Sequence, residues 1–86
     1  MNYKIEFSKN FEKQLKKLSQ NDQRMVFNKV QLMVQSPFHP SLRTKKIQGI
    51  DGLFECSVNM NIRILWKYED GKIILLLEIG HHDILQ

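Results

Sequence analysis

The spacing of apolar residues changes at Gly52, and this change restricts the fold more than any other feature of the chain. Between residues 11 and 34, apolar residues recur every three or four positions, which is the spacing of one helical face. After Gly52, apolar and polar residues alternate over 54–58, as they do in a half-buried strand. Two further apolar segments, 62–68 and 73–79, have the length and composition of core strands. Helices that precede a run of strands place the chain in the α+β class.

The N-terminal half is predicted to hold one more strand and two helices. Residues 3–7 alternate between apolar and polar, which indicates a half-buried strand. Ser8 offers an N-cap for a first helix, and Asp22 offers one for a second. The second helix should end before Pro37, because the residue preceding a proline disfavours the helical region. Helices joined by so short a break are expected to form an antiparallel hairpin packed on the sheet.

Turn residues divide the C-terminal half. Segment 36–50 holds both prolines and several basic residues, and it is predicted to be a long exposed connection. Residues 59–61 predict a turn, and residues 69–71 predict a tight hairpin, because Asp-Gly supplies the positive φ values of a primed turn. The expected structure is a single domain of residues 1–86, with one strand, two helices and then antiparallel strands that complete a four-stranded sheet.

Composition limits the partners and the location. The chain has 86 residues and a formal net charge of +4, which favours an anionic partner, either nucleic acid or an acidic protein. Cys56 is its one cysteine, so no internal disulfide can form and a reducing, cytoplasmic location is expected. No basic-then-apolar leader opens the chain, and no apolar run approaches the ~18–20 residues of a membrane span, so no membrane partner is expected.

Titratable residues follow the last apolar strand. His81, His82 and Asp83 come directly after Gly80, and histidine is the side chain whose ordinary pKa lies nearest neutrality. A rigid strand that ends in these residues is a candidate acid/base site, although a surface histidine bonded to Asp83 would leave the same pattern. Three adjacent residues, even with His39, cannot all converge on one ion, so neither a metal nor another cofactor is predicted.

Three segments together resemble a known family. Gly-Leu-Phe-Glu-Cys-Ser at 52–57, Arg-Ile-Leu-Trp-Lys-Tyr at 63–68 and Ile-Gly-His-His-Asp at 79–83 occur in an order similar to that of the RelE/ParE superfamily of bacterial type II toxins. The similarity covers essentially the whole chain and is greatest to the RelE and YafQ-like mRNA interferases. It implies a twisted antiparallel sheet with a helical hairpin on one face, and metal-independent cleavage of mRNA on the ribosome. It also implies a cognate antitoxin that wraps the toxin in a hetero-oligomer.

The resemblance suggests roles for three residues in cleavage. Breaking RNA without a metal needs a base for the 2′-hydroxyl, cations for the phosphorane and an acid for the leaving oxygen. His82 occupies the position of a functional histidine in the YafQ-like branch and can serve as acid or base. Arg63 matches the strand arginine of the family, which suits a phosphate, or else it neutralises Glu55. Glu55 replaces a basic residue of the relatives and is either a base for the 2′-hydroxyl or the partner of Arg63.

Four more residues are candidates for RNA binding. Lys45 and Lys46 lie close to where the YafQ-like pattern carries a histidine, and their lysine ammonium groups suit phosphate binding rather than acid/base work. Arg43 belongs to the same basic segment, and His81 is the exposed neighbour of His82. A basic loop is also a common solvated surface, so both interpretations stay open.

Two alternatives to a nuclease follow from departures from the family pattern. Gln86 stands where relatives carry an aromatic residue, and Glu55 removes positive charge from the sheet. Both changes favour either a ParE-like protein that inhibits DNA gyrase by binding, or a relative that has lost cleavage and only binds antitoxin. The titratable ending at 80–83 favours the nuclease.

Overall fold

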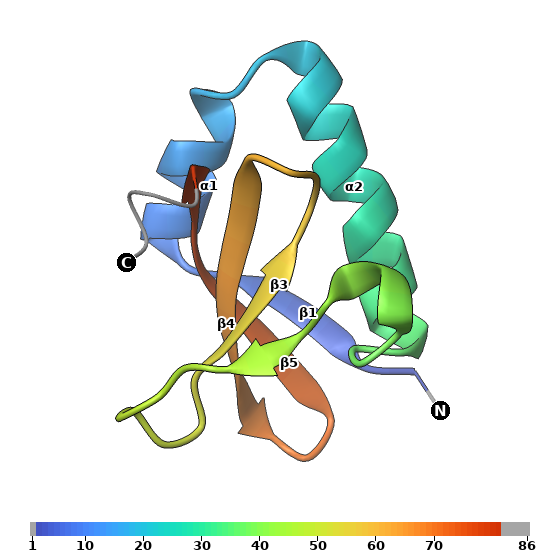
Figure 1. Ribbon diagram of the computed structural model, residues 1–86, viewed down its shortest axis with the longest axis vertical. Coiled ribbons are helices and arrows are strands. Elements are labelled where there is room, and N and C mark those ends of the chain that lie inside the picture. Colours follow the sequence, from blue (N-terminus) through green and yellow to red (C-terminus); the bar gives the residue numbers. More distant parts are fainter. Residues whose placement is uncertain (1, 82–86) are drawn as a thin grey trace.

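The computed structural model describes residues 2–81, which form a five-stranded sheet with two helices (Figure 1). The sheet has the strand order β1-β5-β4-β3-β2; β1 is parallel to β5, and the other neighbours are antiparallel. The elements in chain order are β1 (Lys4–Phe7), α1 (Lys9–Lys16), α2 (Gln20–Gln35), the 3₁₀ helix η1 (Pro40–Leu42), β2 (Lys45–Lys46), β3 (Phe54–Ser57), β4 (Ile62–Asp70) and β5 (Ile73–His81).

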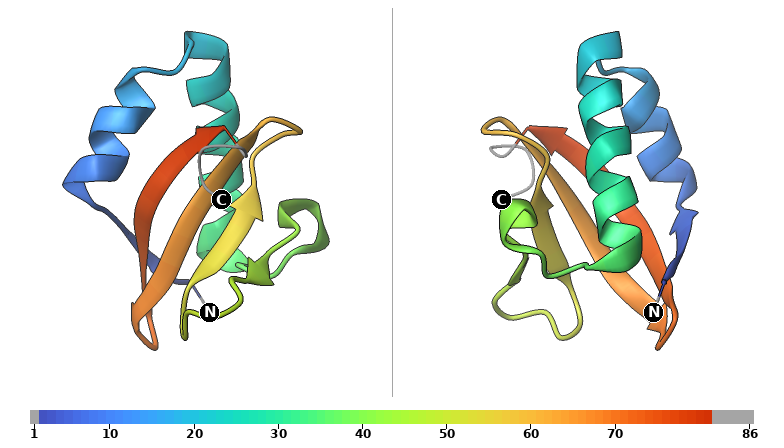
Figure 2. Two further views of the ribbon diagram at one scale, coloured as in Figure 1. Left: turned by 60° about the vertical axis from the view of Figure 1, so that its left-hand side comes forward. Right: turned by 90° about the vertical axis from the view of Figure 1, so that its right-hand side faces the viewer.

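Both helices lie on one face of the sheet and leave the other face uncovered (Figure 2). The core fills the space between them, because alternate residues of the strands point toward the helices. It contains one central tryptophan, Trp66, which is fully buried. The core residues are Phe11, Val26, Met33, Leu42, Phe54, Cys56, Val58, Ile62, Ile64, Trp66, Ile74, Leu76 and Ile79.

Serine caps fix where the two helices begin. The Oγ of Ser8 accepts a hydrogen bond from the backbone N–H of Phe11 at 2.9 Å, which confirms the predicted first cap. The second cap is Ser19, and the prediction of Asp22 was wrong: the Ser19 Oγ accepts from the N–H of Asp22 at 3.1 Å. Ser19 is the cap because its side chain reaches the backbone N–H three residues later, which has no partner within the first turn of the helix. The second helix ends at Gln35, ahead of Pro37, as predicted.

The predicted basic connection contains a fifth strand. Lys45 pairs with Glu55, and Lys46 pairs with Phe54, so the four-strand count was one too few. Gly49 and Gly52 have φ values of 84° and 77°, and only glycine adopts this region without strain. These two glycines reverse the chain tightly enough for so short a strand to pair.

The β4–β5 hairpin forms, but not through the predicted primed turn. Asp70 pairs with Ile73, so Gly71 and Lys72 form the loop, and Gly71 does not have a positive φ. The Asp70 Oδ1 instead accepts hydrogen bonds from the N–H groups of Lys72 at 2.7 Å and Ile73 at 3.1 Å. The carboxylate therefore closes this turn in place of the expected glycine geometry.

Trp66 belongs to the core and not to a surface that stacks on bases. Its ring lies 4.6 Å from that of Phe54 and 5.1 Å from that of Tyr68, measured between centroids. Its Nε1 is buried and has no hydrogen-bond acceptor within residues 2–81. The cost of this unpaired donor is offset by the area that the large aromatic cluster removes from water.

Candidate functional site

Arg63 lies on the face of the sheet that the helices leave uncovered. It stands between Ile62 and Ile64, which are both buried in the core, so its side chain belongs to the other face. Its neighbours across the sheet are Ser57 on β3 and Gly80 on β5. Because Gly80 has no side chain and a Cβ there would meet no atom within 4 Å, space is left beside the arginine.

Backbone carbonyls fix one end of the Arg63 guanidinium. Its Nη1 donates to the carbonyl oxygens of Asn59 at 2.6 Å and Ile62 at 3.2 Å. A guanidinium has five N–H donors in a planar fork. Within the part of the chain that the structure describes, Nε and Nη2 make no hydrogen bond, so they remain available for an anionic ligand.

Asn59 organises the turn that holds Arg63. Its Oδ1 accepts hydrogen bonds from the N–H groups of Asn61 at 2.8 Å and Ile62 at 2.9 Å, which confirms the turn predicted at 59–61. Its Nδ2 lies 3.7 Å from the sulfur of Met25 on α2. Asn59 thus joins the β3–β4 turn to the helix while its carbonyl positions the arginine. The sequence alone predicts only a turn at Asn59 and does not indicate this second role.

A pocket of about 310 Å³ opens beside Arg63 at the edge of β3. Figure 1 shows α2, η1 and the β3–β4 turn around this edge of the sheet. The walls contain three cationic side chains and two serine hydroxyls, and no wall residue is acidic. The residues that line it are Lys29, Ser41, Arg43, Ser57, Val58, Asn59, Met60 and Arg63. Such a pocket suits an anion.

Glu55 is paired with Lys45 and not with Arg63. Its Oε1 lies 3.5 Å from the Lys45 Nζ, and this is the one salt bridge among residues 2–81. The alternative in which Arg63 neutralises Glu55 is therefore not what the structure shows. Glu55 shares the uncovered face with Arg63, two positions along β3 from Ser57.

The other predicted residues are spread over the surface. Arg43 lines the pocket, whereas Lys46 pairs with the core residue Phe54 and is not in the pocket wall. His81 is exposed and pairs with Ile62, which places it on the opposite side of the sheet from Arg63. His82 and Gln86 lie outside the described residues, so the predictions for them stay predictions.

Two further titratable groups lie outside the pocket. Burial, and secondarily the charge of Glu55, raises the pKa of the Cys56 thiol to about 12, which leaves it protonated and unreactive at neutral pH. At the far end of β4, the Glu6 carboxylate accepts a hydrogen bond from the protonated Glu69 carboxyl, and this bond together with the negative charge of Glu6 raises the pKa of Glu69. Glu69 is six residues from Arg63, or about 20 Å along a strand. Nowhere in 2–81 do three His, Cys, Asp or Glu side chains gather as metal ligands.

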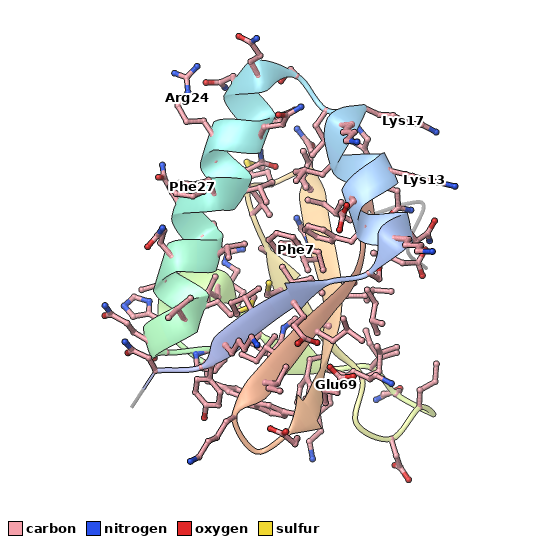
Figure 3. All side chains as sticks on the ribbon, turned by 180° about the vertical axis from the view of Figure 1, so that it is seen from behind. Phe7, Lys13, Lys17, Arg24, Phe27 and Glu69 are labelled. Carbon is pink, nitrogen blue, oxygen red and sulfur yellow. The ribbon has the colours of Figure 1, made fainter. Side chains whose placement is uncertain are left out.

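A second hollow, mostly apolar, lies between the two helices (Figure 3). This interhelical groove has a volume of about 620 Å³ and is lined by Phe7, Phe11, Leu15, Gln20, Gln23, Arg24, Val26, Phe27 and Val30. The Phe7 side chain is 46% exposed and that of Phe27 59% exposed. Arg24 of α2 is among the lining residues, whereas Lys13 and Lys17 project from the outer side of α1, away from α2 (Figure 3).

Comparison with known proteins identifies the fold. No family model matches the chain, and no curated protein matches its sequence. Among solved structures, the archaeal RelE of the RelE–RelB complex from Pyrococcus horikoshii has a TM-score of 0.79 and 18% identity, and the match covers 94% of this chain and 96% of that one. A chain of the E. coli DinJ–YafQ toxin–antitoxin complex has a TM-score of 0.78 and 20% identity, and the match covers 99% of this chain and 98% of that one. The chain has the RelE/ParE toxin fold.

A third structure extends this likeness over the full length. A metal-bound toxin from Helicobacter pylori has a TM-score of 0.78 and 25% identity, with all of both chains covered. The predicted fold, that of the RelE and YafQ toxins, is therefore confirmed. No helix within 2–81 has the length and apolarity needed to cross a bilayer.

Proposed function

We propose that this chain is the toxin of a type II toxin–antitoxin system and that it cleaves mRNA on the ribosome without a metal, in the cytoplasm. The observation that carries the proposal is the Arg63 guanidinium, which is held by two carbonyls beside a pocket with no acidic wall residue. The RelE/ParE toxin fold supports it, because several neighbours with that fold are toxins of such systems.

Each step of the reaction can be given to a residue. Arg63 stabilises the negative charge that develops on the phosphorane, because its free N–H donors face the uncovered side of the sheet. His82 is proposed as the general acid or base from its place in the sequence. Glu55 is proposed as the auxiliary base, and it forms an ion pair with Lys45. Use of the 2′-hydroxyl as nucleophile restricts the substrate to RNA.

Substitution of Arg63 tests this assignment. Arg63→Gln should lower the rate of ribosome-dependent mRNA cleavage by about 10²–10³-fold, the usual effect of losing one transition-state donor. Arg63→Lys should recover only part of the rate, since an ammonium lacks the planar fork. Lys72→Gln, in the distant β4–β5 loop, is the matched control and should cleave normally. If Arg63→Gln folds, by circular dichroism, and still cleaves as fast as the control, the nuclease assignment is wrong.

The gyrase alternative is tested in parallel. The Lys45–Glu55 pair places a carboxylate on the sheet where related nucleases are basic, and this observation favours a protein that acts by binding. Inhibition of DNA supercoiling by the purified chain, without any cleavage of ribosome-bound mRNA, would establish this alternative. A protein inactive in both assays would be the relative that only binds antitoxin.

The proposed partner is an antitoxin with an acidic amphipathic segment, and the interhelical groove is its proposed docking site. Phe7 and Phe27 expose apolar surface there, Arg24 lines the groove, and Lys13 and Lys17 add positive charge on the outer side of α1 (Figure 3). An amphipathic helix would bury the aromatic surface in the groove and place its acidic residues against these cations.

The docking site is tested by measuring the complex that the chain forms with a candidate antitoxin, meaning any small acidic protein encoded in a neighbouring reading frame. Phe27→Ser should weaken that complex at least tenfold, because exposed aromatics at the centre of an interface carry much of its energy. Ile50→Ser is the matched control, since Ile50 is 55% exposed and lies outside the groove. Equal affinities for the two variants would place the antitoxin elsewhere, and self-association lost in Phe27→Ser would mean that a second copy fills the groove.

A further inference from the structure

Lys29 occupies an unusual position in α2. It lies three residues after Val26 and four before Met33, and both of those residues are buried against the sheet. Residues three and four apart share one face of a helix, so a charged residue interrupts the apolar stripe of α2. Lys29 is only partly buried and lines the pocket. A lysine at such a position can lay its aliphatic stem along apolar surface and keep its ammonium in solvent.

Arg43 also has an unusual backbone. Its φ of 51° and ψ of 42° place it in the left-handed region, and it is the one residue other than glycine with positive φ within 2–81. That conformation is unfavourable for an arginine, and it persists only where the surroundings hold it. They do so here: Leu42 is fully buried, and the Thr44 Oγ1 donates to the Pro37 carbonyl at 2.6 Å.

The anchored loop presents two polar side chains to the pocket. Ser41 and Arg43 flank Leu42, and both line the pocket wall. The His39 Nδ1 accepts a hydrogen bond from the N–H of Ser41 at 3.1 Å and lies 3.0 Å from its Oγ. Arg43 is therefore held toward the pocket by a rigid loop, at a position where glycine would be less strained.

Among residues 2–81, no carboxylate forms an ion pair with the three cations of this pocket. Lys29, Arg43 and Arg63 come from three separate elements, and none of them has an acidic group within 4.0 Å in the described residues. Like charges gathered without a counter-charge repel one another, and a bound anion would relieve this repulsion. A volume of about 310 Å³ lies at the lower end of small-ligand sites and accommodates a phosphate group.

We infer that this pocket binds a backbone phosphate of the RNA other than the one that is cleaved, and that Lys29 and Arg43 are substrate-binding residues. The inference rests on the proposed function for the identity of the anion as a single-stranded RNA. Glu55, the proposed auxiliary base, lies on the uncovered face, whereas Lys29 belongs to α2 and Arg43 to the loop after η1. Arg63 borders both regions, so an RNA strand that crosses it would leave the sheet over this edge.

The test uses an RNA hexamer in which every ribose carries a 2′-O-methyl group. This hexamer lacks the nucleophile and cannot be cleaved, so its affinity does not depend on catalysis. Lys29→Met keeps the apolar stem in the stripe of α2, and Arg43→Gly removes the backbone strain. Each should weaken hexamer binding about fivefold or more at low salt. Each should also reduce the slope of log K against log salt by about 0.7, the contribution of one phosphate on a single strand.

The stability of the same variants separates binding from folding. Both substitutions should leave the urea midpoint unchanged or raise it, so weaker binding cannot be attributed to unfolding. Lys72→Met is the matched control for charge, and its affinity should change by less than twofold.

The results also distinguish this inference from the proposed nuclease. Pocket variants that bind the hexamer no more weakly than Lys72→Met would overturn the phosphate site, even if the wild-type protein cleaves mRNA. Selective loss of binding in a protein that never cleaves would support the site and reject the nuclease. If inorganic phosphate competes with hexamer binding equally well in wild type and in Lys29→Met, the phosphate site is also overturned.

Discussion

Replacement of Asn59 by alanine should destabilise the protein by about 2 kcal/mol. The Asn59 Oδ1 accepts two backbone hydrogen bonds, from Asn61 at 2.8 Å and from Ile62 at 2.9 Å. Asn61 is exposed, so its N–H can bind water and its loss costs about 0.5 kcal/mol. Ile62 is 1% exposed, and leaving its N–H unpaired costs about 1–2 kcal/mol. Loss of the amide contact with Met25 adds little, since a thioether is a weak acceptor.

Aspartate at position 59 is the matched variant for this prediction. Asn59→Asp keeps the oxygen that accepts both backbone hydrogen bonds, so stability should remain within about 0.5 kcal/mol of wild type. The same change adds a carboxylate to the wall of the cationic pocket. It should therefore weaken binding of the 2′-O-methyl hexamer while the fold is retained.

Urea denaturation followed by the fluorescence of Trp66, the single tryptophan, measures both variants. A domain of this size has an m-value of about 1 kcal/mol/M, so Asn59→Ala should lower the midpoint by about 2 M and Asn59→Asp by less than about 0.5 M. Equal midpoints for alanine and aspartate would refute the reasoning. So would an alanine variant as stable as wild type, because the oxygen at position 59 would then not support the turn.

Three further predictions concern the core, the anchored loop and the sheet. The Cys56 thiol has a pKa of about 12 in the folded protein and of 9.0 in the unfolded chain. The free energy of unfolding should therefore fall by about 1.4 kcal/mol per pH unit as the pH rises from 9 to 12. Urea midpoints at pH 8 and 10 should show this fall relative to Cys56→Ala, and parallel pH profiles for the two proteins would contradict it. Leu42→Ala removes a fully buried side chain and should lower the free energy of unfolding by about 2–5 kcal/mol, which corresponds to a Tm lower by more than about 8 °C. A Tm within about 2 °C of wild type would mean that Leu42 does not anchor the loop. Glu55→Gln breaks the 3.5 Å ion pair with the largely exposed Lys45 and should change stability by less than about 1 kcal/mol. The affinity for the 2′-O-methyl hexamer should rise, because a negative charge is removed. Loss of mRNA cleavage in this variant would assign Glu55 as the base, whereas normal cleavage would exclude Glu55 from that role.

Local features of the chain could be predicted because they depend on neighbours in sequence. The Ser8 cap, the end of the second helix before Pro37 and the turn at 59–61 all follow from the chemistry of a few adjacent residues. Two local predictions failed where residues compete: Ser19 took the cap expected of Asp22, and the side chain of Asp70 closed its turn without a primed geometry. Propensity alone does not decide between two adequate hydrogen-bond acceptors.

The candidate site was only partly predictable. Arg63 was identified from its place in an apolar strand and from the family resemblance, and the structure shows which carbonyls orient it. Lys29 was missed, although a lysine between Val26 and Met33 in an apolar stripe was a visible signal. The pairing of Glu55 with Lys45 and not with Arg63 depends on β2, a strand too short to predict from its two residues.

The sequence by itself determined the class of fold, because the period of its apolar residues changes from that of helices to that of strands at Gly52. It also determined that an arginine would stand in the penultimate strand. Only the tertiary structure decided that Lys29, Arg43 and Arg63, from a helix, a loop and a strand, line one pocket. The physical reason is that a pocket depends on how separate elements pack, and the direction of a side chain at an element's edge follows from that packing and not from its sequence neighbours.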